Sequence, residues 1–174
     1  MLFRSRMSYA QEGAPAAGVF DPNVFLRIAP DNSVMLLSKH LEMGQAATTG
    51  MAMMVAEELG ADWASMRFEH APNDPNLYNN LLFGPVMGTG GSTSTAESWD
   101  QMRQVGAAAR TIFAQAAAAK WGVPASRIKI EKSVVSDGTP DHRATLGELA
   151  ADAMRLPVPK TVTLKTARDW SLIG

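Results

Sequence analysis

Residues 84–99 have the sequence GPVMGTGGSTSTAESW, in which glycines and hydroxyl side chains directly precede a long alanine-rich segment with helical spacing. Glycine permits left-handed backbone and close approach to a ligand, and a helix start offers unpaired N–H groups at the positive end of its dipole. Together these features favour an anion site, most often for phosphate. The stretch contains neither a Walker lysine nor a GxGxxG fingerprint. A flexible loop running into a Ser/Thr helix cap explains the same pattern, so both interpretations stay open.

Length and composition indicate a globular chain with a buried core. The 174 residues are 46% hydrophobic and carry a net charge of -1, which suits one domain. A charge this small argues against a general nucleic-acid or membrane-surface binder. With no cysteine, the chain has no disulfide, thiolate metal site or iron–sulfur ligand of its own. No apolar run approaches the roughly 18 residues of a transmembrane helix.

The first 20 residues are expected to lie outside the fold. MLFRSR at 1–6 has no apolar segment behind it and is no intact signal peptide. Residues 8–22 are small, polar and rich in Pro and Gly, which is typical of a disordered leader or linker. The folded domain is therefore expected over 21–174.

Apolar periodicity predicts an α+β fold, with hairpins in a mixed sheet packed against two main helices. Four elements are expected on each side of a long loop. In the first half these are strands at 24–28 and 33–38 around a turn, a helix at 48–59 ended by glycine, and a short strand at 67–70.

The second half begins with a long irregular loop at 71–91, and loops of this length are usually functional or disordered. A helix is expected at 95–121, followed by one strand at 128–136. A capping box predicts a further helix at 145–155, and a last short strand is expected at 162–165. The strands and helices lack the strict alternation of a parallel sheet.

A second candidate for a ligand contact is Glu42-Met43-Gly44-Gln45, at the junction of the second strand and the first helix. Gln45 could donate an amide hydrogen bond, and Gly44 would leave space for a bulky ligand. A plain strand-to-helix turn with a core methionine is the simpler alternative. Because both candidate stretches precede a helix, both helix starts could face one site.

The remaining polar residues favour no catalytic group. His40, His70 and His142 lie too far apart in sequence for a metal-binding pair, so each is expected at the surface or beside a partner. Glu57 and Glu58 are expected at a solvated helix end. We predict neither a catalytic residue nor a metal ligand in this chain.

Four stretches resemble the large, molybdenum-binding subunit of isoquinoline oxidoreductase-type enzymes, which belong to the xanthine oxidase family of molybdenum hydroxylases. They are SKHLEMGQ (38–45), AEELGADW (56–63), LYNNLLFGPVMGTGGSTSTAESW (77–99) and AAAAKWGVP (116–124). The resemblance implies part of the molybdenum-cofactor-binding domain, at the N-terminal end of the large subunit and truncated before a hammerhead-like domain.

The resemblance also implies the cofactor contacts. The family's MGQ motif touches the pterin and dithiolene end of molybdenum-molybdopterin, and its Gly/Ser/Thr loop binds pterin and phosphate. The implied cofactor-binding residues are Met43, Gly44, Gln45, Thr89, Gly90, Gly91, Ser92, Thr93 and Ser94. The subfamily implies the molybdopterin cytosine dinucleotide form. Family members usually have MGQG, and we expect Ala46, which replaces the last glycine, to be the first helical residue rather than a strained left-handed one.

Beyond the cofactor, the resemblance implies hydroxylation of an N-heteroaromatic or aldehyde substrate with water-derived oxygen. The implied partners are a [2Fe-2S] small subunit and the remainder of the large subunit, which carries the catalytic glutamate. A periplasmic location is expected, with the cytoplasm as the alternative. Two other functions stay open: a non-catalytic phosphate- or nucleotide-binding module, and a subunit-contact scaffold with an exposed apolar loop at 81–83.

Overall fold

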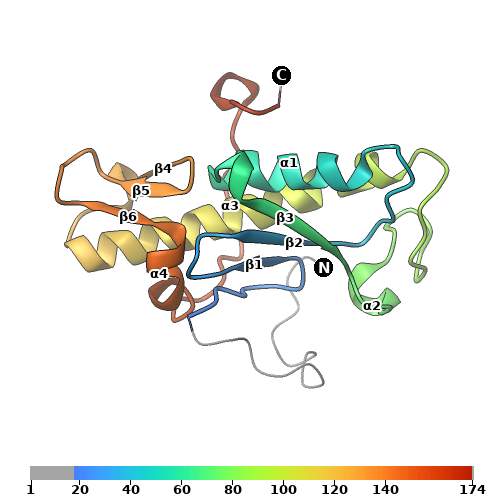
Figure 1. The fold of residues 1–174 in the computed structure, drawn as a ribbon, viewed down its shortest axis with the longest axis horizontal. Coiled ribbons are helices and arrows are strands. Elements are labelled where there is room, and N and C mark those ends of the chain that lie inside the picture. The colour runs from blue at the N-terminus through green and yellow to red at the C-terminus, as the bar shows by residue number, and fades with distance from the viewer. Residues whose placement is uncertain (1–17, 174) are drawn as a thin grey trace.

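The structure, a computed structural model, describes residues 18–173 (Figure 1). Its first sheet contains β1 (Leu26–Ile28), β2 (Val34–Ser38) and β3 (Met66–His70), with β2 in the centre. β1 and β2 form the predicted antiparallel hairpin, with Leu26 opposite Leu36. β3 lies parallel to β2, so the helix between them is a crossover connection.

The crossover is α1 (Ala47–Leu59), which ends at Gly60 as predicted. Gly60 has φ +79, and a Cβ at this position would lie 2.2 Å from the carbonyl oxygen of Ile130. Only glycine meets both conditions, because L side chains rarely adopt this backbone and no atom fits in this space. The end of α1 is thereby fastened to the second sheet.

The second main helix, α3 (Ser94–Trp121), packs along α1 in parallel. Near their starts, Gly50 faces the side chain of Thr95. Further along, a Cβ on Gly106 would lie 2.6 Å from the carbonyl oxygen of Val55, so glycine permits the close approach of the two backbones. The starts of α1 and α3 therefore lie at the same end of the molecule (Figure 1).

The second sheet, β4 (Lys129–Glu131), β5 (Val134–Ser136) and β6 (Arg143–Thr145), is antiparallel throughout. The prediction of one strand at 128–136 is wrong, because Lys132 and Ser133 adopt left-handed φ of 48° and 62° and turn the chain back. The apolar alternation continues through this tight turn, and no glycine marks it, so the sequence pattern did not predict it.

α4 (Leu146–Ala153) begins with the predicted capping box, formed by Thr145 and Glu148. The predicted strand at 162–165 is wrong, because its backbone groups bond to side chains of α1 and α3 instead of to a neighbouring strand. The remaining short elements are η2 (Trp63–Ser65), α2 (Pro75–Tyr78), η3 (Ala125–Arg127) and η4 (Ala167–Asp169).

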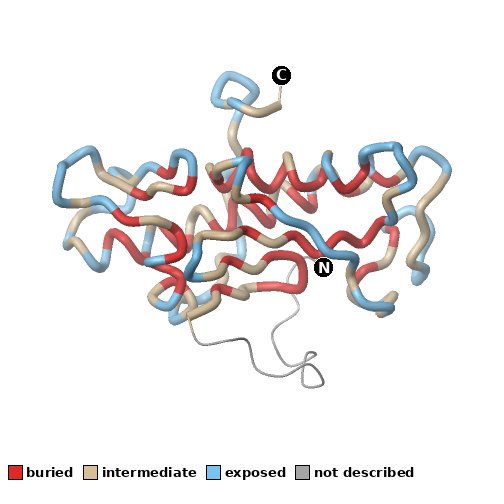
Figure 2. Tube along the Cα trace, viewed as in Figure 1, coloured by how far each residue is buried: buried red, intermediate tan, exposed pale blue. Residues whose placement is uncertain are grey.

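The core lies where α1 and α3 face each other and the sheets (Figure 2). It includes Met102, Ile112 and Phe113 from the predicted stripe of α3. Phe20 belongs to this core as well, since it bridges to Ile28 and its ring lies 4.7 Å from that of Phe113. The expected boundary at residue 20 thus falls on a core residue, and residues 1–17 of the expected leader lie outside the described part.

The expectation that Glu57 and Glu58 form a solvated helix end is wrong, since both are buried. Glu58 pairs with Arg103 at 2.8 Å and with Arg110 at 3.1 Å. We call these three residues the Glu58 cluster. Its partners lie 45 and 52 positions along the chain, a separation that local sequence patterns do not report.

Glu57 binds the last part of the described chain. It pairs with Lys165 at 3.0 Å and accepts backbone N–H groups from Ser171 and Leu172. Burial raises the pKa of Glu57, but these N–H groups and Lys165 outweigh it, so the pKa lies below its ordinary value. The carboxylate fastens the C-terminal segment to the far end of the helix pair.

Candidate cofactor site

Two loops meet at the shared start of α1 and α3. We call residues 41–46 the MGQ loop and residues 84–93 the glycine loop. The backbone N–H of Leu41 donates to the hydroxyl of Thr89 at 2.9 Å, which joins the two loops directly. The two motifs singled out from sequence are thus brought to one place, as the parallel helix packing requires.

The MGQ loop is held in shape by its own glutamine. The Gln45 amide nitrogen donates to the carbonyl of Leu41 at 2.8 Å, and its oxygen accepts the N–H of Met43 at 2.6 Å. A primary amide has two N–H groups, so one remains for a ligand. Met43 is 67% exposed and is no core methionine. Gly44 has φ +92 with no atom within 4 Å of a Cβ position, which leaves open space above the loop.

The prediction that Ala46 is the first helical residue is wrong. Ala46 precedes α1 with φ 61° and ψ 26°, in the left-handed region. A residue with a Cβ is strained there by roughly 1–2 kcal/mol. The glycine that the resembled family usually has at this position would adopt the same backbone without that strain.

The start of α1 is already occupied by a carboxylate of the chain. Glu42 accepts N–H groups from Gly44 at 2.8 Å, Ala46 at 3.0 Å and Thr48 at 3.2 Å. The Thr48 hydroxyl also donates to it at 2.7 Å. This hydroxyl and the backbone N–H groups lower the pKa of Glu42 to about 2.

The start of α3 has no such partner. Its N-cap residue, Thr93, makes no side-chain capping hydrogen bond. Gly91 and Ser92 are consecutive left-handed residues, with φ 59° and 56°. Within residues 18–173, the N–H groups of Gly90, Gly91 and Ser92 donate to no protein acceptor. A Cβ at Gly90 would meet no atom within 4 Å, so the surface over these N–H groups is open.

The hydroxyl side chains of the glycine loop differ in their availability. Thr89 is bonded to Leu41, and Thr93 donates to the carbonyl of Gly90 at 2.8 Å. Ser94 is buried, whereas Ser92 is exposed. Ser92 is therefore the loop hydroxyl best placed for a ligand.

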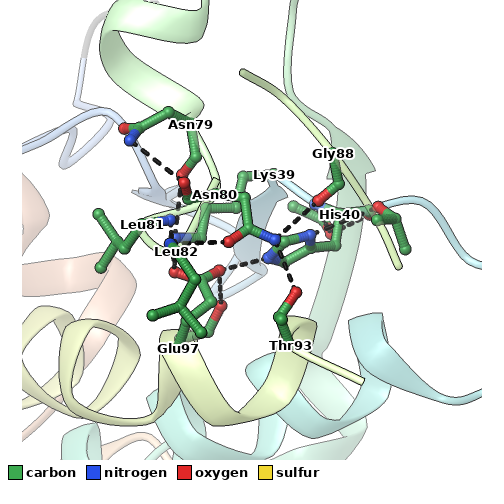
Figure 3. Close-up of polar contacts among 12 residues, drawn as sticks. Lys39, His40, Asn79, Asn80, Leu81, Leu82, Gly88, Thr93 and Glu97 are labelled. Atoms are coloured by element: carbon green, nitrogen blue, oxygen red, sulfur yellow. Dashed lines mark hydrogen bonds and ion pairs between the residues drawn. The ribbon is translucent and has the colours of Figure 1, made fainter. Parts of the chain in front are cut away.

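Two buried polar side chains, those of Asn80 and Glu97, hold the loops from the protein interior (Figure 3). Asn80 donates to the carbonyl of Gly88 at 3.0 Å and to the hydroxyl of Thr93 at 2.8 Å, and it accepts the N–H of Leu82. Glu97 binds other segments instead of capping α3. Neither residue was predicted from the sequence, although an asparagine within the long loop and an acid in the first turn of a helix are visible signals.

Glu97 binds two side chains from the residues that directly follow β2. It lies 2.7 Å from the Lys39 ammonium and 2.5 Å from Nε2 of His40. Burial raises the pKa of Glu97, but the hydrogen bonds from His40 and Lys39 outweigh it and leave the pKa below its ordinary value. Burial lowers the pKa of Lys39. The expectation that a histidine has a protein partner is confirmed for His40.

The other histidines take no part in these loops. His70 is exposed, and His142 stacks on Trp121 with ring centroids 5.2 Å apart. In the described chain no group of three or more His, Asp or Glu side chains is arranged to hold a metal ion. No helix between residues 18 and 173 is long and apolar enough to cross a membrane.

An open helix start with unpaired N–H groups, next to a loop with clear space above it, has the chemistry to bind an anionic group. The particular family follows from the sequence. The chain matches the molybdopterin cofactor-binding domain family over residues 5–172 and belongs to it. The expected membership of the xanthine oxidase family of molybdenum hydroxylases is confirmed.

Two relatives match most of this chain. Isoquinoline 1-oxidoreductase subunit beta of Brevundimonas diminuta is 36% identical over 140 residues, which are 80% of this chain and 18% of that protein. Membrane-bound aldehyde dehydrogenase (pyrroloquinoline-quinone) of Gluconacetobacter polyoxogenes is 33% identical over 173 residues, 92% of this chain and 20% of that protein. The chain thus spans about a fifth of the length of each.

Solved structures share the fold. Quinoline 2-oxidoreductase from Pseudomonas putida 86 superposes with a TM-score of 0.56 at 20% identity, over 72% of this chain and 15% of that one. Reconstituted CO dehydrogenase from Oligotropha carboxidovorans superposes with a TM-score of 0.53 at 25% identity, over 80% of this chain and 17% of that one. The predicted α+β class is confirmed.

Proposed function

We propose that this chain holds the molybdopterin cofactor of a molybdenum hydroxylase across its two loops. The phosphate end lies at the start of α3, and the pterin and dithiolene end lies at the MGQ loop. The observation that carries this orientation is the difference between the helix starts, since Glu42 already occupies the start of α1. The open N–H groups directly before α3 are the better place for phosphate oxygens.

Each loop contributes a different kind of contact. The N–H groups of Gly90, Gly91 and Ser92, with the Ser92 hydroxyl, would donate to phosphate oxygens. The remaining N–H of Gln45 would donate to the other end of the cofactor, over the space that Gly44 leaves. Ser94 would contribute through its backbone, because its side chain is buried, and Met43 through its exposed side chain. Thr93 would instead shape the loop, because its N–H and its hydroxyl both donate to the carbonyl of Gly90.

The bound cofactor would supply insertion of water-derived oxygen at an electron-poor C–H bond. We propose an N-heteroaromatic or aldehyde substrate, supported by the isoquinoline and aldehyde named for the two relatives. The cytosine dinucleotide form, a [2Fe-2S] partner subunit, contact with the remainder of the large subunit and a periplasmic location are proposed from the family resemblance alone.

The test measures molybdenum and pterin in purified full-length subunit carrying Gln45→Ala or Gly91→Asp. The introduced aspartate would place a carboxylate among the N–H groups meant for phosphate, so Gly91→Asp is expected to lose most of its cofactor. Gly138→Asp is the matched control, because Gly138 is also left-handed and a Cβ at either glycine meets no atom closer than 3.8 Å, yet Gly138 lies in the β5–β6 loop. Normal cofactor content in both loop variants would overturn the proposal.

A phosphate- or nucleotide-binding module is the second candidate, because the open start of α3 needs no molybdenum to bind an anion. Binding of inorganic phosphate or a nucleotide by protein that never acquires molybdenum would favour it. The scaffold alternative rests on the exposed side chains of Leu81, Leu82 and Phe83. It would gain support if protease cleaved this loop in the isolated chain and not in the assembled enzyme.

A further inference from the structure

Within residues 18–173, one side chain, that of Thr89, connects the glycine loop and the MGQ loop by a hydrogen bond. Its hydroxyl oxygen accepts the N–H of Leu41 at 2.9 Å and lies 3.4 Å from Nδ1 of His40. Because the oxygen already accepts from Leu41, its own proton is free to donate to the histidine. Both partners of Thr89 thus lie on the strand side of the site, and the hydroxyl has no remaining proton for a ligand.

Glu97 determines which nitrogen of the His40 ring carries a proton. Its carboxylate lies 2.5 Å from Nε2, so Nε2 carries a proton and donates it. In a neutral ring, Nδ1 is then an acceptor for the Thr89 hydroxyl. The glutamate side chain is 1% exposed and is also held by Lys39 and by the N–H of Leu81 at 3.2 Å. A carboxylate held in this way rarely changes rotamer, so the histidine ring is held as well.

We propose that Thr89 is a positioning residue whose hydroxyl fastens the glycine loop to the MGQ loop. Glu97 sets the direction of this hydroxyl, because it fixes the His40 nitrogen that accepts the hydroxyl proton. The inference rests on the proposed function for its consequence, the alignment of two cofactor contacts. It departs from the residue roles implied by the resemblance, since the Thr89 hydroxyl is assigned to the protein and only its backbone N–H is left for the cofactor.

The consequence of the Thr89 hydrogen bond is a fixed distance between the two loops. Asn80 holds the glycine loop from its other side, through Gly88 and Thr93. It has no bond to the MGQ loop, so Asn80 shapes one loop while Thr89 sets the distance between the two. Loss of the Thr89 hydroxyl should leave each loop folded and let them move apart.

The first experiment compares Thr89→Val with Thr89→Ser in protein purified without cofactor, by amide hydrogen exchange. Valine has the shape of threonine without its hydroxyl, and serine retains the hydroxyl. We expect the Leu41 amide to exchange about five- to tenfold faster in Thr89→Val, as for one lost hydrogen bond, and at the wild-type rate in Thr89→Ser. Wild-type exchange in Thr89→Val, or equally fast exchange in both variants, would overturn the proposal.

The second experiment tests Glu97 by comparing Glu97→Gln with Glu58→Gln. Both neutralise a buried, ion-paired glutamate of the helix pair, but the Glu58 cluster lies away from the loops. Faster exchange at Leu41 is expected for Glu97→Gln alone. The same change in Glu58→Gln would show general loosening and would contradict a role for Glu97 in loop position.

Both readouts use cofactor-free protein, so they remain valid if no molybdopterin binds. Cofactor content is then measured separately. Loss of cofactor in Thr89→Val with unchanged Leu41 exchange would assign the hydroxyl to the cofactor and overturn the inference. Wild-type protein without any cofactor would contradict the proposed function and leave the exchange result intact.

Discussion

The starts of α1 and α3 have the same local design and opposite electrostatic outcomes. In the last few residues before each start, two residues are left-handed, Gly44 and Ala46 at α1 and Gly91 and Ser92 at α3. At α1 the chain supplies its own anion, the Glu42 carboxylate. At α3 the corresponding N–H groups stay open, and the nearby Glu97 bonds elsewhere. The comparison shows that a helix start becomes a candidate ligand site only where the protein leaves it uncapped.

The largest effect is expected from giving α3 the kind of cap that α1 has. Thr93→Asp would place a carboxylate at the capping position, where its negative charge lies beside the N–H groups of Gly90, Gly91 and Ser92 and repels phosphate. We expect the affinity for molybdopterin to fall about 10- to 100-fold, following the typical energy of charge-assisted hydrogen bonds. The measurement is cofactor content after purification. Thr93→Asn has the same shape without the charge, and an equal loss in that variant would show that charge is not the cause.

The converse change removes the cap of α1. Glu42→Gln cannot accept as many N–H groups, so the start of α1 should loosen and the midpoint of thermal unfolding should fall by a few degrees, about the effect of a lost cap. Thermal unfolding by circular dichroism measures it. Glu148→Gln, in the capping box of α4, is the control for loss of a helix-cap charge elsewhere. An unchanged midpoint in Glu42→Gln would mean that the cap contributes nothing.

The same cap predicts a pH dependence. Because the pKa of Glu42 falls from 4.5 to about 2 on folding, its stabilisation is complete above pH 4.5 and disappears as the pH falls towards 2. The difference in unfolding midpoint between wild type and Glu42→Gln should therefore shrink across this window. A difference that stays constant down to pH 2 would contradict the assignment of the shift to Glu42.

The smallest effect concerns strain at the two loops. Ala46→Gly would relieve a left-handed alanine and raise the free energy of unfolding by about 0.5–1 kcal/mol, since greater freedom of the unfolded chain offsets part of the gain. Chemical denaturation measures this difference. Ser92→Gly applies the same change at α3, so the pair compares strain at the two starts. Destabilisation by Ala46→Gly would show that the left-handed backbone is not strained.

Much of the fold was predictable because it depends on local patterns. Apolar spacing located the first hairpin, and glycine marked the end of α1. The capping box located α4. Local patterns failed at Lys132 and Ser133, where non-glycine residues form a tight turn, and at residues 162–165, whose backbone is bonded by Glu58 and Arg110.

By itself, the sequence determined the family, the fold class and the two stretches that precede helices. These properties follow from residue type and spacing over a few turns of chain. Only the tertiary structure decided which helix start is open and how the loops are joined. Glu42 bends back into its own loop, Glu97 turns away from α3, and Thr89 bonds a residue 48 positions earlier in the chain. The partner of a buried polar group is set by the packing of distant segments, because its desolvation must be compensated by whichever group the fold places within reach.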